Sequence, residues 1–432
     1  MFMVGYHLTQ SQRRAFDAFT SGTNMFLTGK GGTGKSFLVE RIKEWAEERD
    51  LKVISCAPTG VAALNIHGET IHKVLGCGIG IMSPTEVCHN KERLEILEKA
   101  DMIIMDEVSM CRADLFSVFA NTILGVWRKR GKPFRLLFVG DFYQLPPVLS
   151  RSEEDAYASY YADRLFAFET EQWDELGLKT YELTEQVRQT ERAFIESLDN
   201  IREGVADFSA LKACCRKSFD SESITLCGRN KEASDINWRK LMELTKDPLL
   251  IEGEVTGDFR ENDYLVEREL YLAPGAKVMM LNNDPLGNWV NGTIGQVERF
   301  VWADGELTSI LVKLVSGKTV EVAPVKYTAF YYKTSRKEGK FKIDRVEVSS
   351  ITQYPMKLSW AISIHKSQGQ TFDKVNLNID SIFSAGQLYV ALSRCRTLHG
   401  LTIKGALTPE KVMANPKVVA FMKRPVEREL FW

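Results

Sequence analysis

Short apolar runs alternate with longer amphipathic stretches over the first 150 residues of the chain. The runs are "NMFLTG" (24–29), "KVISCAPT" (52–59), "MIIMDE" (102–107) and "RLLFVGD" (135–141), and each ends in polar residues or glycine. Stretches with helical patterning, such as residues 35–49, lie between them. This alternation predicts an α/β fold with a doubly wound sheet, whose ligand sites lie at the carboxyl ends of the strands.

The same alternation returns in the second half of the chain, but it is interrupted. From residue 222, "SITLCGRN" precedes the helical pattern "KEASDINWRKLMELT". A turn-rich segment of about residues 255–350 follows, in which "PLGNWVNGTIGQVERFVWADGELTSILVKL" is typical of short strands and hairpins. The α/β pattern resumes with "WAISIHKSQGQTFDKVNLNID". We therefore expect two α/β domains, with a small β-barrel-like module inserted in the second.

Composition places this fold in an ordinary globular protein. The 432 residues are 44% hydrophobic and 26% charged, which allows two or three domains. No apolar run is long enough for a membrane span, and "MFMVGYHLTQ" lacks the features of a secretory signal, so we expect a cytoplasmic protein. The 8 cysteines form no C-x-x-C pair, which indicates reduced thiols and disfavours a zinc site.

The formal net charge of −1 limits how the chain could bind nucleic acid. A protein that only coats nucleic acid is usually strongly basic, because phosphate neutralisation supplies most of its affinity. Contacts with nucleic acid must here be local, or made by backbone amides and helix N-termini.

A phosphate-binding motif lies between the first apolar run and the first helical stretch. Residues 29–36, "GKGGTGKS", fit G-x-x-x-x-G-K-[ST] in the strand–loop–helix context that the motif requires. The backbone amides of residues 31–34 (Gly31, Gly32, Thr33 and Gly34) are expected to curl around phosphates, which side chains would obstruct. Lys35 should reach the β- and γ-phosphates, and Ser36 should bind Mg²⁺. The alternative is a glycine-rich turn that only joins a strand to a helix, and the match of both motif and context disfavours it.

Two later strand ends supply the remaining hydrolytic groups. In "IIMDEVSM", Asp106 can hold Mg²⁺ and Glu107 can polarise an attacking water, although adjacent carboxylates also occur in solvated loops. In "GDFYQLPPV", Gln144 can contact the γ-phosphate and the water, and a polar residue in a proline-stiffened loop is an equal alternative. The sequence thus predicts a site for ATP and Mg²⁺.

Two arginines lie far along the chain from the phosphate loop. Arg188 is in "LTEQVRQ", where Glu185 offers an ordinary ion pair, and Arg394 ends the apolar run of "YVALSR". The functional alternative is that both arginines neutralise charge on the departing γ-phosphate, a contribution of about 10³–10⁵ in rate.

The order of these motifs resembles that of the superfamily 1, subfamily B DNA helicases. The motifs are "LTQSQ", "GKGGTGKS", "APTGVAALNIHGETIH", "DEVSM", "GDFYQLPPV", "LTEQVRQ", "SIHKSQGQTF" and "VALSR". The chain is most similar to the petite integration frequency (Pif) family, with RecD-like helicases next, from about residue 8 to residue 400.

This resemblance implies the domain plan. A RecA-like domain is expected at 1–185, with a small wedge insertion at about 73–98. A second RecA-like domain is expected at 186–254 plus 355–432, with an SH3-like β-rich module inserted at 255–354.

The resemblance also implies roles for individual residues. Gln12 would read the adenine, Gln144 would sense the γ-phosphate, and Arg188 and Arg394 would be arginine fingers. The resemblance also assigns Gly369 to the nucleotide-binding residues. The larger eukaryotic members have a long N-terminal region that is lacking here, so we expect a compact bacterial or phage enzyme that associates with the nucleoid.

Candidate DNA contacts rest partly on strand-end chemistry and partly on the resemblance. Each position taken singly is equally compatible with a polar loop. They are Thr59, Gly60, Thr70, His72, Arg229, Asn230, Lys231, His365, Lys366 and Ser367.

Two further stretches could act on a DNA strand. Residues 75–87, "LGCGIGIMSPTEV", coincide with the wedge region of the family, or form a loop packed on their own lobe. Residues 326–345 mix Tyr327, Phe330, Tyr331 and Tyr332 with lysines and arginines, which suits a single strand but suits an exposed hairpin better.

The sequence therefore predicts an ATP-dependent helicase that translocates 5′ to 3′ along single-stranded DNA. Its expected partners are single-stranded and forked or structured DNA, and it is expected to act as a monomer. Whether G-quadruplexes are substrates is left open. The alternative is a nucleotide-gated DNA-binding or remodelling ATPase that does not separate strands, and the 75–87 loop distinguishes the two.

Overall fold

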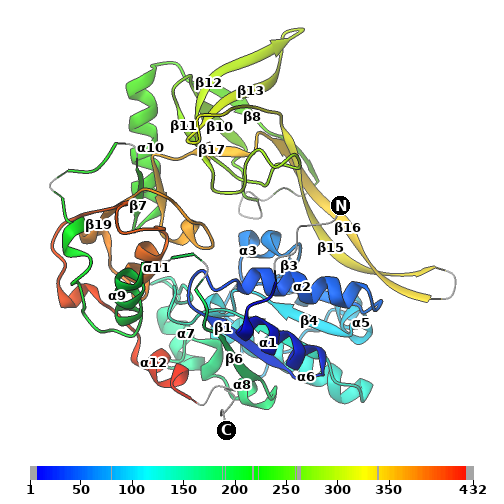
Figure 1. The fold of residues 1–432 in the computed structure, drawn as a ribbon. Coiled ribbons are helices and arrows are strands. Elements are labelled where there is room, and N and C mark those ends of the chain that lie inside the picture. Colours follow the sequence, from blue (N-terminus) through cyan, green and yellow to red (C-terminus); the bar gives the residue numbers. More distant parts are fainter. Residues whose placement is uncertain are drawn as a thin grey trace. The chain divides into compact units, whose positions relative to one another are not determined.

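The computed structural model describes residues 7–424, except 79, 187, 190, 217, 222, 258, 260–263 and 338–339. Two compact units divide the chain. Unit 1 contains residues 1–188, 330–346 and 416–432, and unit 2 contains residues 189–329 and 347–415. Figure 1 shows the elements of both units.

Unit 1 is built on a parallel sheet, which confirms the α/β class predicted from the first 150 residues. Its strand order is β3-β2-β4-β5-β1-β6, and every neighbouring pair is parallel. The strands are β1 (Met25–Gly29), β2 (Val53–Ala57), β3 (Glu69–Thr70), β4 (Met102–Met105), β5 (Arg135–Val139) and β6 (Lys179–Leu183). Strands β1 and β4 are buried along their whole length, as expected for a sheet covered on both faces.

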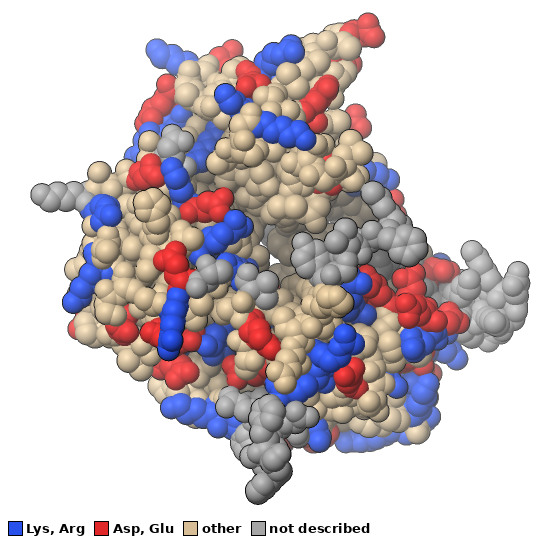
Figure 2. All heavy atoms as spheres, viewed as in Figure 1, with Lys and Arg blue, Asp and Glu red and all other residues tan. Residues whose placement is uncertain are grey.

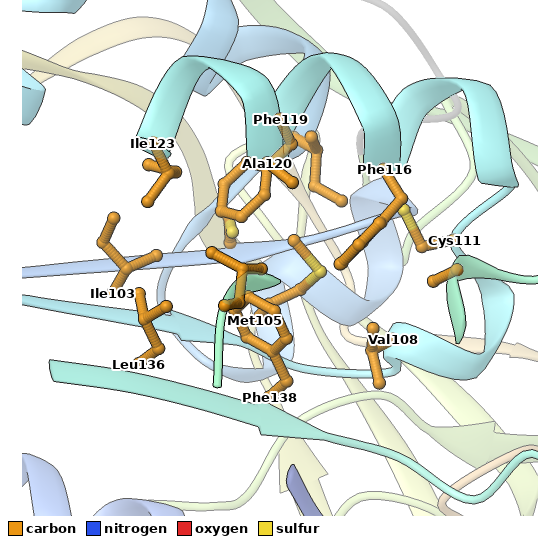
Figure 3. Close-up of a cluster of buried hydrophobic side chains, with 14 of the residues drawn as sticks. Ile103, Met105, Val108, Cys111, Phe116, Phe119, Ala120, Ile123, Leu136 and Phe138 are labelled. Atoms are coloured by element: carbon orange, nitrogen blue, oxygen red, sulfur yellow. The ribbon is translucent and has the colours of Figure 1, made fainter. Parts of the chain in front are cut away.

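Helices cover both faces of this sheet with apolar side chains. On one face, Phe19 of α1 and Ile42 of α2 pack with Leu137 of β5. On the other, α6 lays Phe116, Phe119 and Ile123 against β4 and β5, as Figure 3 shows. The helices of the unit are α1 (Gln10–Thr20), α2 (Lys35–Glu47), α3 (Gly60–Asn65), α4 (Ile71–Leu75), α5 (Lys91–Lys99), α6 (Ala113–Arg130), α7 (Glu154–Tyr161), α8 (Glu171–Glu175) and α12 (Pro416–Met422).

The C-terminal helix α12 belongs to the core of unit 1. Phe421 stacks on Phe168 with the ring centroids 4.2 Å apart, and its centroid lies 5.5 Å from that of Phe142. Lys417 forms ion pairs with Asp163 and Glu169. The expected second RecA-like domain included residues 355–432, so the structure differs from that boundary after residue 415. Aromatic packing between residues about 250 positions apart decides this placement.

A β-hairpin also contributes to unit 1, which includes residues 330–346. Strands β15 (Val325–Lys337) and β16 (Lys340–Gln353) form the hairpin, and Tyr332 is buried in the unit 1 core cluster. The Ser55 N–H donates to the Tyr332 hydroxyl over 3.1 Å, and the Tyr332 N–H donates to the Glu69 carboxylate. Tyr332 therefore has a packing role. The two strands expected in residues 326–345 are present, but the expectation of an exposed hairpin is wrong at Tyr332, which is buried.

Unit 2 contains a second parallel sheet, of order β18-β7-β19-β20. Its strands are β7 (Ile224–Cys227), β18 (Ala361–Ser363), β19 (Val375–Asn378) and β20 (Leu401–Lys404). The helices of unit 2 are α9 (Arg192–Arg202), α10 (Asn230–Leu244) and α11 (Gln387–Ser393). The α/β alternation predicted from residue 222 onwards is therefore present in this unit, and the boundaries of a second RecA-like domain stay a prediction.

The β-rich insertion is also present. Its five-stranded antiparallel sheet has the order β14-β13-β12-β11-β17. These strands are β11 (Lys277–Met280), β12 (Ile294–Ala303), β13 (Glu306–Leu314), β14 (Thr319–Val322) and β17 (Met356–Leu358). Strand β8 (Leu249–Glu252) pairs with β10 (Glu269–Leu272), and β9 (Glu254–Gly257) pairs with β16. The likeness to an SH3 barrel remains a prediction.

No helix in the described part of the chain combines the length and the apolar character needed to cross a membrane.

Candidate functional site

The parallel sheet of unit 1 brings most of the predicted nucleotide residues to one edge. The loop that follows each strand begins at the same edge because all six strands run in one direction. The phosphate loop follows β1, and Asp106, Gln144 and Arg188 follow β4, β5 and β6. The phosphate loop, Asp106 and Gln144 thus follow strand ends as the sequence predicted, and the roles of these residues stay predictions.

The phosphate loop requires glycine at two positions. Gly32 and Gly34 have φ angles of +92° and +82°, which side chains rarely tolerate. A Cβ on Gly32 would lie 2.4 Å from the Cβ of Arg188, and one on Gly34 would lie 2.5 Å from Nε2 of Gln12. The bare backbone thus allows two neighbouring segments to close on the loop.

Lys35 begins α2 and holds the loop in shape. Its Nζ donates to the carbonyl of Gly29 over 2.7 Å and to the carbonyl of Lys30 over 3.2 Å. An ammonium group has three N–H donors, so it can bridge the loop and still point a proton at a phosphate. Ser36 follows in the first turn of α2 and is exposed, where a helix N-terminus favours anions.

Gln12 is buried and fastened to the same loop. It closes a capping box with Thr9 at the start of α1, accepting from the Thr9 N–H over 3.0 Å. Its Nε2 donates to the carbonyl of Thr33 over 3.1 Å. The resemblance assigns Gln12 to the adenine, and the structure places it against the phosphate loop.

Asp106 and Glu107 follow β4 and have different environments. The Asp106 carboxylate accepts from the Glu107 N–H over 2.9 Å. Burial raises the pKa of Asp106, while that hydrogen bond and the charge of Lys35 act in the opposite direction. Glu107 has a φ of +50°, an uncommon backbone conformation that is found more often at functional sites.

These groups have the chemistry that Mg²⁺ requires. Mg²⁺ prefers oxygen ligands, usually one or two protein groups together with substrate phosphates. Asp106 supplies a half-buried carboxylate and Ser36 an exposed hydroxyl, both next to the phosphate loop. The residues present therefore fit the ion.

Asp141 is a residue that the sequence reasoning missed. It is 1% exposed and follows β5, where its carboxylate accepts from the Tyr143 N–H and from Nε2 of Gln144 over 3.2 and 3.3 Å. Asp141 thus orients Gln144. The motif "GDFYQLPPV" contains this aspartate directly after an apolar strand, and this position could have identified it.

The alternative ion pair of Arg188 is not formed. Among the described residues, Glu185 accepts from the Ser11 N–H over 3.0 Å, from the Ser11 hydroxyl and from the Thr184 hydroxyl. Burial alone would raise the pKa of Glu185, but the hydrogen bonds from Ser11 lower it to about 2. Arg188 instead packs against Gly32 of the phosphate loop.

The candidate DNA contacts of unit 1 lie at the same sheet edge but also cap helices. The Thr59 hydroxyl accepts from the Ala62 N–H at the start of α3, over 3.3 Å. The Thr70 hydroxyl accepts from the Lys73 N–H at the start of α4, over 3.4 Å. Burial lowers the pKa of His72, which favours a neutral ring at pH 7. Gly60 is the first residue of α3 and directly follows the N-cap residue Thr59.

The candidate DNA contacts of unit 2 are brought together from two adjacent strands. Residues 229–231 (Arg229, Asn230, Lys231) follow β7, and residues 365–367 (His365, Lys366, Ser367) follow its parallel neighbour β18. The Ser363 hydroxyl joins the two loops, because it donates to Oδ1 of Asn230 over 2.5 Å and accepts from the Lys366 N–H. The arrangement predicted at matching strand ends is therefore observed in this unit.

Exposure differs within this set. Arg229, Lys231 and Lys366 are exposed, and the Arg229 guanidinium lies 4.9 Å from the ring centroid of Phe383. Ser367 is fully buried and donates its hydroxyl to the carbonyl of Ile364, while burial lowers the pKa of His365. The exposed cations are the groups best placed to meet a phosphate.

Arg394 ends α11 and is 1% exposed. Its Nε donates to the carbonyl of Val390 over 2.9 Å, and its Nη1 donates to the carbonyls of Ser367 and Gln370 over 3.4 and 3.3 Å. Within unit 2, Arg394 thus ties α11 to the 365–370 turn. Gly369, in that turn, is exposed and has a φ of +76°.

The 75–87 loop is packed on its own unit over its described residues. The Met82 N–H donates to the buried carboxylate of Asp114, and Nη2 of Arg112 donates to the carbonyl of Gly80. Nδ2 of Asn121 donates to the carbonyl of Pro84. These contacts tie residues 80–84 to α6 and the turn before it, and residue 79 lies outside the described residues.

Comparison with known proteins extends these observations. Residues 7–212 match the family described as PIF1-like helicase. The ATP-dependent DNA helicase Pif1 of Bdellovibrio bacteriovorus is 31% identical over 437 residues, covering 96% of this chain and 92% of the relative. A crystal structure of Bacteroides sp Pif1 in complex with ADP-AlF4 matches with a TM-score of 0.85 and 31% identity over 97% of each chain. A structure described as the basis for DNA unwinding at forked dsDNA by two coordinating Pif1 helicases matches with a TM-score of 0.66 and 30% identity, again over 97% of each chain.

The link between Ser11 and Glu185 predicts a pH dependence. The pKa of Glu185 is lowered from 4.5 to about 2, so its hydrogen bonds stabilise the folded state above pH 4.5, and this stabilisation is lost as the pH falls towards 2. Glu185→Gln should lower the free energy of unfolding at pH 7, and its difference from wild type should narrow as the pH falls below 4.5. Urea unfolding at a series of pH values measures this difference. Glu95→Gln, at an exposed position of α5, is the control, and a difference that stays constant with pH would contradict the assignment.

Proposed function

This chain belongs to the PIF1-like helicase family, and we propose that it moves 5′ to 3′ along single-stranded DNA while it unwinds the duplex ahead. The activity itself follows from the family: the chain is an ATP-dependent DNA helicase. The observation that carries the site assignment is the convergence of Lys35, Asp106, Gln144 and Arg188 at one edge of the unit 1 sheet.

ATP binding uses the phosphate loop. The amides of residues 31–34 surround the phosphates, and the Lys35 ammonium, already held by the carbonyl of Gly29, contacts the β- and γ-phosphates. Ser36 and Asp106 would hold Mg²⁺, which neutralises charge on the phosphates when bound. Gln12 lies beside the loop and contributes to the recognition of the nucleotide.

Hydrolysis uses the residues that follow β4 and β5. Glu107 accepts a proton from the water that attacks the γ-phosphate. Gln144, oriented by Asp141, contacts the γ-phosphate and that water. Arg188 lies against the phosphate loop, where a guanidinium can neutralise charge that develops as the γ-phosphate leaves.

Arg394 is the second proposed finger. Its support is a planar guanidinium held in place by three backbone carbonyls at the end of α11. Because the Ser367 and Gln370 carbonyls belong to the turn that follows β18, movement of Arg394 towards a phosphate would also move that turn. We propose that ATP turnover changes DNA contacts through this connection.

The proposed DNA track uses loops at the strand ends of both units. In unit 1 these are the N-termini of α3 and α4, and in unit 2 they are the exposed Arg229, Lys231 and Lys366. Such local contacts agree with a net charge of −1, since a chain that is not basic overall must bind phosphates through local groups. We propose that the enzyme acts as a monomer, in the compartment that holds bacterial or phage DNA.

The comparison with known helicases disfavours the alternative, an ATPase that binds or remodels DNA without separating its strands. The relative from Bdellovibrio is named a DNA helicase and matches 96% of this chain. The packing of residues 80–84 on their own unit leaves Gly76 and Gly78 exposed, so it does not by itself exclude a wedge. A wedge in the 75–87 loop remains part of the proposal.

Glu107→Gln is expected to bind ATP and DNA while turnover falls by about 10²–10⁴-fold. The amide keeps the shape of the side chain but cannot accept the proton. Lys35→Ala serves as the comparison, because it should lose ATP binding together with hydrolysis. Nucleotide binding and steady-state ATPase rates distinguish the two, and loss of nucleotide affinity in Glu107→Gln would move this residue to a structural or metal-binding role.

Arg394→Lys should lower DNA-stimulated hydrolysis by at least about a hundredfold while DNA binding stays nearly normal. Lysine keeps the charge but not the planar fork that reaches several oxygens at once. ATPase rates with and without single-stranded DNA measure the effect. Normal hydrolysis by Arg394→Lys would show that the arginine only stabilises the 365–370 turn.

Forks with a single tail test the direction of movement. We expect unwinding of a duplex that carries only a 5′ tail, and little unwinding when the tail is 3′. Strand separation is followed by fluorescence, with Glu107→Gln as the inactive control. Equal or opposite preference would overturn the 5′-to-3′ proposal, and a G-quadruplex placed in the duplex would show whether such structures are also resolved.

A further inference from the structure

The loop between β11 and β12 of unit 2 displays the apolar side chains of Leu286 and Val290 to solvent. On the face drawn in Figure 2, cationic and acidic side chains are interspersed with uncharged ones, so charge alone does not mark out a binding surface. Leu286 is 86% exposed and Val290 is 62% exposed. Within residues 282–292, which we call the prong loop, Asp284 is the one charged residue, and the neighbouring exposed positions are asparagine, proline or glycine. Single exposed apolar residues are ordinary, so the loop needs further evidence before a role is assigned.

The prong loop is held in one conformation by its own polar groups. The Asp284 carboxylate accepts from the N–H and from Nδ2 of Asn288, over 2.9 and 2.6 Å. Nε1 of Trp289 donates to Oδ1 of Asn282 over 3.1 Å, and the Trp289 ring is buried in the core of the β-rich insertion. None of these bonds involves the side chain of Leu286. The loop therefore presents Leu286 to solvent without depending on it for stability.

The base of the prong loop lies against the turn that carries candidate DNA contacts. A Cβ on Gly292 would lie 4.0 Å from the Cβ of Gln370. Gln370 ends the 365–370 turn, which also contains Lys366 and is held by Arg394. An apolar projection and a proposed strand-binding turn are thus neighbours within the same unit.

Two cations flank this position. Lys357 on β17 pairs in register with Met279 of β11, the strand that leads into the prong loop. Burial and the nearby charge of Lys366 lower the pKa of Lys357 to about 8, although the charge of Glu267 acts in the opposite direction. Among the described residues, neither lysine side chain has a hydrogen bond or an ion pair with an acid. A bound anion would relieve this repulsion, because an opposite charge favours the charged form of both lysines.

We propose that the prong loop contacts bases of the translocating strand, with Leu286 and Val290 packed on a base face while Lys357 and Lys366 hold the adjacent backbone phosphates. The inference rests on the proposed function and adds a base-contacting element to it. Single-stranded DNA offers apolar base faces and regularly spaced phosphates, and proteins bind it in positively charged grooves where aromatic side chains stack on the bases. Leu286 and Val290 would offer an aliphatic surface to a base face in the same position. Because every base has such a face, the contact would tolerate any sequence.

The experiment compares two strands that share a backbone but differ in bases. One is a fluorescent oligothymidine, and the other is an abasic strand of the same length. Leu286→Ser should weaken binding of the thymidine strand by about fivefold or more and leave binding of the abasic strand unchanged. Val315→Ser is the matched control, because Val315 is 75% exposed in another turn of the same insertion and should have no effect on either strand.

Salt dependence separates the role of the lysines from that of Leu286. Lys357→Gln combined with Lys366→Gln should weaken binding of both strands and reduce the slope of log affinity against log salt by about 0.7 for each phosphate that is no longer neutralised. Leu286→Ser should leave this slope unchanged, because it removes no charge.

Two results would overturn the proposal. One is normal binding of the thymidine strand by Leu286→Ser, which would leave the exposed leucine to another partner such as a protein. The other is an equal loss of affinity for both strands, which would show that the prong loop affects only the binding of the backbone. Wild-type binding and fork unwinding in the same buffers report on the helicase itself, so a failure of the proposed function is distinguished from a failure of this inference.

Discussion

The close approach of other segments to the bare backbone of the phosphate loop is the constraint on which the nucleotide site depends. Gly32 and Gly34 leave room for Arg188 and Gln12, and a Cβ at either glycine would lie within 2.5 Å of these residues. Gln12 comes from α1 and Arg188 from the segment after β6, so the loop fixes three distant parts of the chain against one another. The positive φ angles that permit this approach also turn successive N–H groups towards a shared anion.

Electrostatics at the site follow from burial. Asp106 is surrounded by protein, which disfavours its charged form, and Lys35 partly offsets that effect. A divalent cation and the phosphates of a nucleotide would complete this balance, because the carboxylate gains a partner and the phosphates are neutralised. The net charge of the whole chain is −1, so attraction to a polyanion such as DNA must also come from local charged groups.

Unit 1 is completed by segments from later in the chain. Tyr332, from the β15–β16 hairpin, and Phe421, from α12, both lie in the core of unit 1, although unit 2 contains the residues on either side of the hairpin tip and those preceding α12. The chain therefore passes between the units after residues 188, 329, 346 and 415. Loss of either aromatic side chain from this core would expose apolar surface in unit 1 and free a segment that begins in unit 2.

Local patterns in the sequence were sufficient to predict the α/β class, the phosphate loop and the strand ends that carry the proposed hydrolytic residues. These patterns are hydrophobic runs bounded by glycine or polar residues, and glycines at positions where side chains would collide. Folding in three dimensions was needed to show which unit α12 joins, that Tyr332 is a core residue, and that Glu185 pairs with Ser11 instead of Arg188. It also showed that Asp141 orients Gln144 and that Arg394 is held by carbonyls of the 365–370 turn. Most of these contacts join residues far apart in sequence, and their partners are selected by packing and hydrogen-bond geometry that periodicity does not encode.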